Sequence, residues 1–246
     1  MTALAVPMLD CISPRTAMIR LRARWELACR HPRDFQRWFC FTNKASKRVD
    51  AAGRIYYANV ETPYPWDRPH LLALNELWLH NPRGLVSKCR QMLATWWLAT
   101  LGLWDGLCHD GRLIMFQSKR EEDVLGDMET GDGLMGRAKY ILTRIPYQRE
   151  LGIEYANFEN GTTKLVITGR HSTIWAIPQG GQVIRQRTAG GIATDETAQQ
   201  LEFEESFTAS VPCTRSGGWY WGATTAALKD KGFSRKLVKD LLDDER

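Results

Sequence analysis

Residues 82–96 carry the types of side chain needed to hold a phosphate group. A short apolar run, 84–87, leads into a basic turn and then into a segment with helical periodicity. A strand, turn and helix in this order point backbone N–H groups and the helix N-terminus at one spot, which makes an anion site. Lys88 and Arg90 supply positive charge there, and the Thr95 hydroxyl is suited to a magnesium ion. The pattern therefore indicates phosphate binding, or else only a basic turn before a buried helix.

This segment departs from the standard phosphate-binding pattern G-x-x-x-x-G-K-[ST]. Leu93 and Ala94 stand where that pattern has its second glycine and its lysine. The departure puts in doubt how tightly the turn can wrap a phosphate chain, but it does not exclude binding.

A pair of carboxylates follows later in the chain, where Asp195 and Glu196 end a short β-rich run, 190–194. Two acids at a strand end can divide the work of phosphate hydrolysis. The first holds magnesium, and the second orients and deprotonates the attacking water. We expect the two side chains to diverge, because neighbouring residues of a strand point to opposite faces. The alternative interpretation, a solvated turn, stays open for an Asp-Glu pair taken by itself.

The elements that must position these residues alternate between strands and helices. The periodicity predicts helices over 15–48, 69–80, 92–107, 121–145 (broken at 131–136), 196–210 and from 234 onward. It predicts strands over 84–87, 112–116, 153–158, 163–168, 172–177, 191–194 and 219–223, and a loop or short hairpin over 50–68. This order is typical of an α/β fold, with a mainly parallel sheet and helices on both faces.

The composition sets broad limits on the kind of protein. The chain has 246 residues, a net charge of +5 and an isoelectric point near 8.9, so a polyanionic partner is plausible. The six cysteines are scattered without a C-x-x-C pair, which favours reduced thiols in a cytosolic protein. The longest apolar stretch, 92–103, is too short to span a bilayer. The basic segment 15–48 is either a helical cap packed on the domain or an arm that contacts DNA.

The segment Lys88–Trp96 resembles the deviant Walker A motif of phage large terminases, K-x-R-Q-x-x-x-[ST]-W. The resemblance implies a P-loop NTPase core of the RecA-like, ASCE type. It implies that Lys88, at the start of the loop, binds the β- and γ-phosphates of ATP, and that Thr95 ligates Mg²⁺. Arg90 would be catalytic, stabilising the charge on the transferring phosphoryl group. The cofactor-binding loop would also contain Cys89 and Gln91.

Residues 172–198 are similar to the terminase segment that ends in the Walker B motif. On this basis Asp195 would hold Mg²⁺, and Glu196 would be the catalytic base. Arg185 lies within the segment and would contact phosphate or a neighbouring subunit, unless it is simply solvated at the surface.

Three further segments resemble parts of the same family. Residues 222–225 look like the coupling motif, a hydroxyl-bearing strand end that senses the γ-phosphate, with Thr224 favoured slightly over Thr225. Residues 116–123 and 144–146 are similar to the strand and helix that follow Walker A. Residues 62–66 and His70 occupy the region where terminases recognise adenine, although core packing is the favoured role of Trp66.

Taken over roughly residues 35–230, the resemblance implies an ATP-hydrolysing motor domain that translocates double-stranded DNA into procapsids. It divides the chain into an N-terminal basic extension (1–50), an ATPase core (51–232) and a C-terminal helix or linker (233–246). No nuclease domain and no DNA cleavage are expected of this chain. The implied partners are double-stranded DNA, a portal protein, a small terminase subunit and further copies in a ring, at the procapsid in the host cytoplasm and away from membranes.

Two other functions stay open at this point. One is a P-loop fold that has lost turnover and acts as a binding module for DNA or the portal, which the degenerate Walker A motif favours. The other is a related RecA-like helicase or translocase, which the absence of a second motor domain disfavours.

Overall fold

The computed structural model describes residues 13–89 and 91–225, apart from the side chains of 44–48 and 56–59. Its centre is a six-stranded sheet in the order β3 (Arg83–Lys88), β8 (Trp219–Thr225), β7 (Gly191–Asp195), β4 (Leu113–Gln117), β6 (Ser172–Ile177) and β5 (Lys164–Ile167). The first five strands are parallel and β5 is antiparallel to β6. The predicted, mainly parallel sheet is therefore confirmed.

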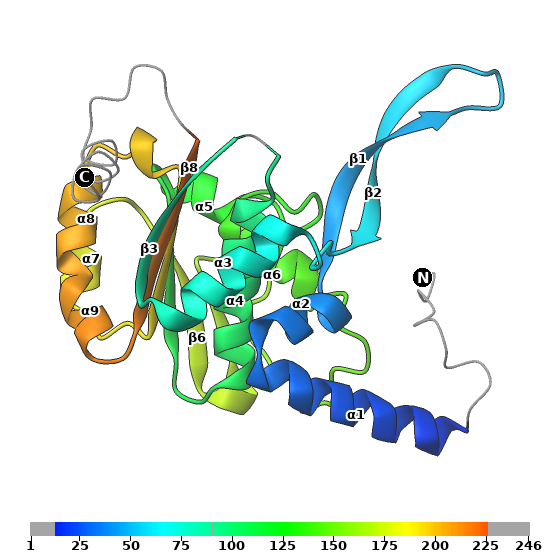
Figure 1. The fold of residues 1–246 in the computed structure, drawn as a ribbon, viewed down its shortest axis with the longest axis horizontal. Helices are drawn as coiled ribbons and strands as arrows, with labels where there is room; N and C mark the ends of the chain where they lie inside the picture. The colour runs from blue at the N-terminus through cyan, green and yellow to red at the C-terminus, as the bar shows by residue number, and fades with distance from the viewer. Residues whose placement is uncertain (1–12, 90, 226–246) are drawn as a thin grey trace.

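Helices cover both faces of this sheet, as predicted (Figure 1). Successive side chains of a strand point to opposite faces, so Trp219 and Trp221 of β8 join one buried cluster and Tyr220 joins the other. One face is covered by α4 (Ala94–Cys108) and α6 (Leu134–Leu142), with the short α5 (Glu121–Leu125) beside them. The other is covered by α7 (Gln182–Arg185), α8 (Phe203–Ala209) and α9 (Val211–Arg215).

The most deeply buried helix is α4, in which 13 of the 15 residues are buried. A helix that is apolar all round belongs in the interior of a domain. Glycines let it approach the sheet closely: a Cβ at Gly102 would lie 2.3 Å from the Phe116 ring of β4. The helix therefore runs directly beneath the sheet, and its N-terminus emerges at the carboxyl end of β3.

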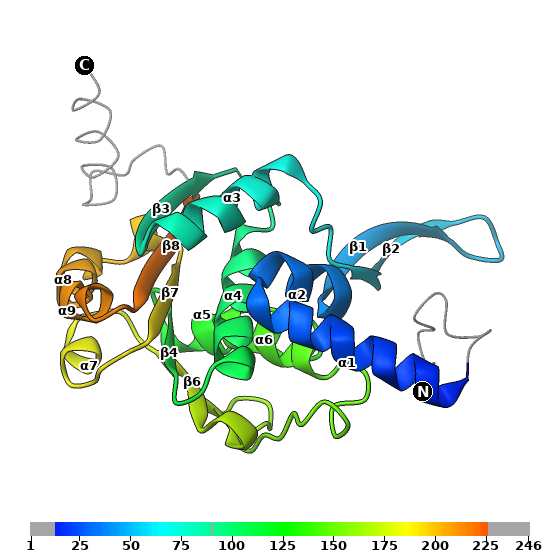
Figure 2. The same ribbon diagram turned by 60° about the horizontal axis from the view of Figure 1, so that its bottom comes forward.

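Three helices from the N-terminal part pack against α4: α1 (Pro14–Arg30), α2 (Pro32–Phe39) and α3 (Pro69–His80), the last with its predicted bounds (Figure 2). The Trp104 indole of α4 donates to the Ala28 carbonyl of α1 at 2.8 Å, and a buried polar network joins α2 and α3 to α4. The Gln36 amide donates to Thr100 of α4 at 2.9 Å, and Asn75 of α3 donates to Gln36 at 2.8 Å. The indole of Trp97 donates to Asn75 at 2.8 Å. Helices α1 and α2 are thus part of the same core as the sheet.

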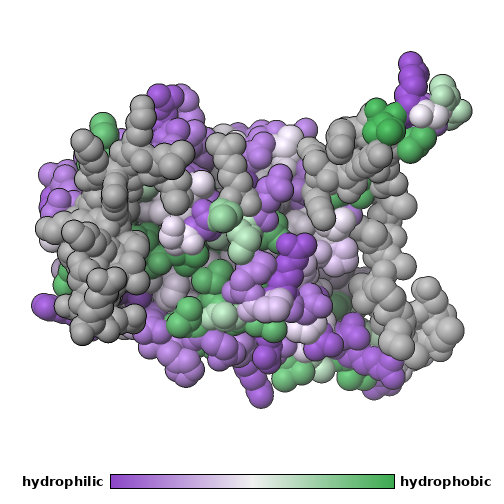
Figure 3. Space-filling model, turned by 45° about the horizontal axis from the view of Figure 1, so that its top comes forward, coloured by the Kyte–Doolittle hydropathy of each residue, from purple (hydrophilic) through white to green (hydrophobic). Residues whose placement is uncertain are grey.

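A long hairpin leaves the body between α2 and α3. Its strands β1 (Phe41–Val49) and β2 (Ile55–Pro63) pair antiparallel along their whole length, and the hairpin stands clear of the surface (Figures 1 and 3). Residues 41–48 were predicted to be helical, which is wrong. Their pairing with β2 satisfies the backbone of a polar segment whose own pattern carries no clear strand alternation.

Two other predicted elements differ from the structure. Residues 153–158 contain only a single bridge, Ala156 to Val166, because Asn157 takes a left-handed conformation with φ 55°. The predicted helix 196–210 is divided into a 3₁₀ turn (Thr197–Gln199) and α8, because Glu196 is left-handed and Gln200 is extended. A further 3₁₀ turn spans Thr168–Arg170. The predicted C-terminal helix lies outside the described residues, and within them no helix is long and apolar enough to cross a membrane.

A buried carboxylate locks the far end of α4 to the sheet. Asp105 accepts hydrogen bonds from the Arg112 guanidinium at 2.9–3.2 Å and from the Trp219 indole at 2.9 Å. His109 pairs with the same carboxylate at 3.0 Å. Burial opposes ionisation, but these partners hold the pKa of Asp105 below its ordinary value. One charged group therefore joins α4 to β4 and β8.

We predict that Asp105→Ala lowers the free energy of unfolding by about 3 kcal/mol, because it leaves Arg112 and the Trp219 N–H without their buried acceptor. The control is Asp110→Ala. Asp110 is 72% exposed and pairs with Arg170 at 3.2 Å, so its loss should cost less than about 1 kcal/mol. Urea unfolding of both variants measures the difference, and equal values for the two would contradict the structural role given to Asp105.

Candidate active site

The carboxyl ends of three neighbouring strands bring together most of the residues singled out from the sequence. Strand β8 lies between β3 and β7, with Lys88 of β3 opposite Thr225 and Asp195 of β7 opposite Ala223. Because all three strands run in the same direction, their last residues meet at one edge of the sheet. Lys88, the acidic pair and the hydroxyls of 224–225 therefore share one site.

The Lys88 ammonium contacts both acids of the pair. Its Nζ lies 3.8 Å from Asp195 Oδ1 and 3.5 Å from Glu196 Oε1, and only 10% of the Lys88 side chain is exposed. The sequence predicted that the two carboxylates would diverge. They converge instead, because Glu196 has φ 52° and this left-handed residue breaks the alternation of the strand. This conformation places both acids on one cation, and their contacts with Lys88 help to maintain it.

Asp195 is the most perturbed acid of the site. Burial raises its pKa above the ordinary value, while Lys88 and a hydrogen bond with the Thr95 side chain lower it. Its Oδ1 is buried and has no hydrogen-bond partner. The Thr95 hydroxyl and this carboxylate thus lie side by side, with acceptor capacity left for a further group.

The turn between β3 and α4 resembles a phosphate loop in its backbone, although not in its residues. Gln91 and Leu93 both have positive φ, 65° and 59°, and Leu93 caps α4 in the left-handed conformation. Leu93 occupies the position of the motif's second glycine, the residue that adopts such a conformation most easily. The first N–H groups of α4 lack partners within the helix and face the site. Arg90 lies outside the described residues, and Cys89 is exposed on this turn.

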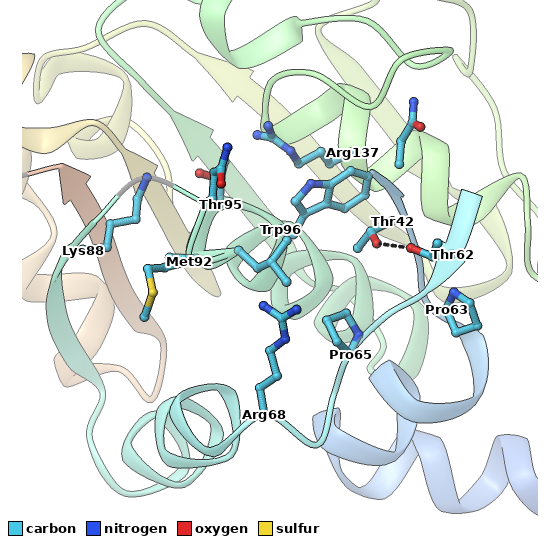
Figure 4. A pocket seen from close by; sticks show the side chains of 14 residues that line it. Thr42, Thr62, Pro63, Pro65, Arg68, Lys88, Met92, Thr95, Trp96 and Arg137 are labelled. Atoms are coloured by element: carbon cyan, nitrogen blue, oxygen red, sulfur yellow. Dashed lines mark hydrogen bonds between the residues drawn. The ribbon is translucent and has the colours of Figure 1, made fainter. Parts of the chain in front are cut away.

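A cavity of about 810 Å³ opens beside this turn (Figure 4). This volume lies within the roughly 300–1,000 Å³ range of small-molecule sites. The cavity is lined by the turn and first residues of α4 (Lys88, Gln91–Trp96), by the base of the hairpin (Thr42, Asn43, Thr62, Pro63), and by Pro65, Arg68 and Arg137. Among the described residues that line it, three are cationic and none is acidic, so the cavity is suited to an anion.

The remaining predicted residues fall in different places. Thr224 accepts a hydrogen bond from the Ala198 N–H at 3.0 Å, whereas the Thr225 hydroxyl donates to the Glu196 carboxylate at 3.3 Å. Arg185 lies on α7, pairs with Glu205 at 2.6 Å and borders a separate cavity on the other face of the sheet. The structure does not bring Arg185 together with Lys88 or the acidic pair.

The segment expected near adenine lies partly on the cavity. Its residues 62, 63 and 65 line the wall, while Trp66 stacks under the Arg37 guanidinium at 4.8 Å. The His70 ring is 3.2 Å from the Met92 carbonyl and ties α3 to the phosphate-loop turn.

Sequence reasoning missed two cations of the cavity, Arg68 and Arg137. Arg68 caps the N-terminus of α3 and is exposed. Arg137 stands in α6 behind Gly133 and Gly136, and the break predicted at 131–136 was the only sequence signal near it. Neither residue belongs to a motif, so only the tertiary fold reveals that they face Lys88.

A magnesium ion fits the donors of this edge. In the described part of the chain, no three His, Cys, Asp or Glu side chains gather as a metal-binding group. Thr95 and Asp195 supply two oxygen donors, and the unpartnered Oδ1 of Asp195 is a hard ligand of the kind Mg²⁺ prefers. A bound ion would take its other ligands from water and from a substrate's phosphate oxygens, as is usual for Mg²⁺.

Lys88→Met should lower the free energy of unfolding by about 2 kcal/mol at neutral pH, because it removes the positive charge that offsets the repulsion between two neighbouring carboxylates. When a carboxyl group has a higher pKa in the folded protein than in the unfolded chain, the folded protein becomes less stable as the pH rises from the lower pKa through the higher one. The substitution raises the pKa of Asp195 further, so the loss should be largest near pH 7.5 and shrink towards about pH 4.5.

Urea unfolding at the two pH values measures this effect. The matched control is Lys164→Met, since Lys164 is exposed on the edge strand β5 and far in sequence from the acids. A loss at Lys88 that is independent of pH would contradict its pairing with Asp195.

Comparison with known proteins reveals similarity at the level of structure. No protein-family model matches the chain, and no curated protein sequence is significantly similar to it. The HK97 bacteriophage large terminase superposes with a TM-score of 0.59 at 15% identity, over 88% of this chain and 42% of that one. The Thermus phage P74-26 large terminase ATPase domain gives 0.45 at 12% identity, over 64% of each chain. A large terminase from a thermophilic bacteriophage, in complex with ADP, gives 0.44 at 10% identity, over 59% of this chain and 34% of that one. The chain thus spans less than half the length of the HK97 protein, and it shares the fold of the matched part of that large terminase.

Proposed function

We propose that this chain is an ATP-hydrolysing motor domain of a terminase, which moves double-stranded DNA into procapsids. One observation carries the proposal. Lys88 of β3 meets Asp195 and Glu196 at the carboxyl ends of the two strands that flank β8, and Thr95 of α4 bonds to Asp195. Beside them lie a helix N-terminus and a cavity of about 810 Å³, whose described lining residues include no acid. This is the set of groups needed to hold a triphosphate and to hydrolyse it.

In this proposal the phosphate chain lies against the turn and the first N–H groups of α4, where the helix dipole favours negative charge. Lys88 reaches the β- and γ-phosphates from the end of β3. Thr95 and Asp195 would hold Mg²⁺, which supplies charge neutralisation for the phosphate oxygens when bound. Cys89, Arg90 and Gln91 complete the binding loop, and Arg90 stabilises the transferring phosphoryl group.

Glu196 is the proposed general base, which takes a proton from the attacking water. Its carboxylate is oriented from two sides, since Oε1 accepts from Thr225 at 3.3 Å and Oε2 accepts from Gln199 at 3.0 Å. Phosphate oxygens would compete with Glu196 for the Lys88 ammonium, which lies only 3.5 Å from Oε1. Binding of the nucleotide therefore favours release of the Glu196 carboxylate towards water.

Strand β8 is the proposed coupling element, because it runs between the lysine strand and the acidic strand. Thr224 would sense the γ-phosphate, and its present bond to the Ala198 N–H links it to the turn that follows Glu196. Arg185, on the opposite face, would act towards a neighbouring subunit. We propose double-stranded DNA, a portal protein, a small terminase subunit and further copies of the chain in a ring as partners, in the host cytoplasm.

A second candidate is a nucleotide-binding or DNA-binding module without turnover. The observation in its favour is that Lys88 is engaged by both acids, while Ala94 stands at the position of the standard lysine. Retained nucleotide binding with no hydrolysis by the unmodified chain, with or without DNA, would select this candidate.

We predict that Glu196→Gln keeps ATP binding but lowers DNA-stimulated turnover by about 100-fold or more, because the amide cannot accept the proton of the attacking water. Steady-state phosphate release with double-stranded DNA measures turnover, and thermal unfolding with ATP and Mg²⁺ measures binding. The control is Glu204→Gln, an exposed acid on α8, which should behave like the unmodified chain.

Lys88→Ala is expected to abolish the stabilisation by ATP and Mg²⁺, because it removes the cation that reaches the phosphates. The same thermal unfolding assay measures this effect. Wild-type turnover in both Glu196→Gln and Lys88→Ala would show that the two assignments are wrong.

A further inference from the structure

The distribution of charge around the cavity points to a second phosphate contact besides Lys88. Lys88, Arg68 and Arg137 frame the cavity from different elements, as Figure 4 shows. Lys88 is compensated by the acidic pair behind it. Arg68 is exposed to solvent. Arg137 differs from both, since its side chain is half-buried and lies beside the entrance to α4.

The position of Arg137 is fixed by the loop 126–133, which precedes α6. Asp127 organises this loop: its carbonyl accepts from the Gly131 and Asp132 N–H groups at 2.9 and 3.0 Å. A Cβ at Gly136 would lie 2.7 Å from the same carbonyl, so glycine is needed for α6 to start this close to the loop. Asn43 at the hairpin base donates to the Thr130 carbonyl at 2.9 Å. The first turn of α6, and with it Arg137, is therefore held rigidly at the cavity.

The guanidinium of Arg137 stacks on Trp96, with its carbon 5.3 Å from the ring centroid. Trp96 belongs to the first turn of α4, the turn that would hold the phosphates. The stack holds the guanidinium against the first turn of α4, and Arg137 lines the cavity there.

The Arg137 guanidinium forms no ion pair with a described residue. Burial lowers its pKa, and Asp195 and Asp132 attract its charge only from beyond contact distance. Its Nε is buried without a hydrogen-bond partner, and its one hydrogen bond, from Nη1, goes to the Gly133 carbonyl of its own helix at 3.4 Å. No carboxylate lies within 4.0 Å of it in the described part of the chain. By contrast, Arg112 and Arg144 each pair with a carboxylate. A desolvated guanidinium without an anion is costly, which indicates that the anion comes from a ligand.

We infer that Arg137 is a phosphate-binding residue, which donates to the nucleotide's phosphate oxygens from α6, while Lys88 reaches them from β3. The inference rests on the proposed nucleotide site and adds a residue to it that belongs to no motif. A planar guanidinium can donate two parallel hydrogen bonds to one phosphate group, a geometry that Lys88 cannot provide.

The test compares Arg137→Met with the unmodified 246-residue chain. Calorimetric titration measures the binding of ATP with Mg²⁺ and of inorganic tripolyphosphate, and thermal unfolding measures the stability without ligand. We expect binding of both ligands to weaken by about 10- to 100-fold, as for the loss of hydrogen bonds to a charged group. The unfolding temperature without ligand should not fall, because the substitution removes a partly buried charge that has no ion pair. Arg137→Lys should recover part of the affinity, and Arg149→Met, an exposed control, should change neither quantity.

The possible outcomes separate this inference from the proposed function. Unchanged affinities in Arg137→Met overturn the inference, as does a fall in ligand-free stability that accounts for the lost binding. If the unmodified chain binds tripolyphosphate but not ATP, and Arg137→Met weakens that binding, the phosphate contact holds and the nucleotide function fails. If the unmodified chain binds neither ligand, both are wrong.

Discussion

Helix α4 has to be enclosed on nearly every side, and the rest of the domain is arranged to enclose it. Its apolar surface is covered by the sheet, by α6 and by the N-terminal helices. The polar and charged groups of this helix that need partners lie at its two ends. At one end Asp105 joins it to β4 and β8, and at the other Thr95 and the first N–H groups face the cavity. The position of the active edge thus follows from the requirement to bury this helix.

Charge is distributed unequally between the two sides of the site. The acids lie at the end of β7 and share one ammonium, whereas the charged residues among the described lining of the cavity in front of them are all cations. Burial raises the pKa of Asp195. Because the two acids partly neutralise the charge of Lys88, most of the positive potential in the cavity comes from Arg68 and Arg137. A polyphosphate entering the cavity would meet positive charge first and the acidic pair only beyond it.

Much of the fold could be predicted from the sequence, because the central strands and α4 are strongly apolar and are bounded by polar turns. Helix α3 and strand β6 have their predicted bounds, and the lysine and acidic motifs lie together. The predictions failed where long-range pairing or backbone conformation decides the structure. Residues 41–48 form a strand because they pair with β2, although their own sequence pattern favours a helix. The left-handed conformation of Glu196 turns the second acid towards Lys88. The position of Arg137 at the cavity could not be predicted, since it depends on how the loop 126–133 and α6 pack against the hairpin base and α4.

The order of strands in the sheet has a consequence for how the molecule forms. Strand β8 is the last described strand in the chain, yet it provides the only link in the described sheet between β3 and its other strands. Its partner β3 precedes it by more than a hundred residues, as the pairing of Arg83 with Tyr220 shows. Such non-local pairing is slow, because the intervening chain must first be brought into place. During synthesis, therefore, the lysine strand cannot join the acidic strand through the sheet until β8 has emerged, and the site is assembled only from that point on.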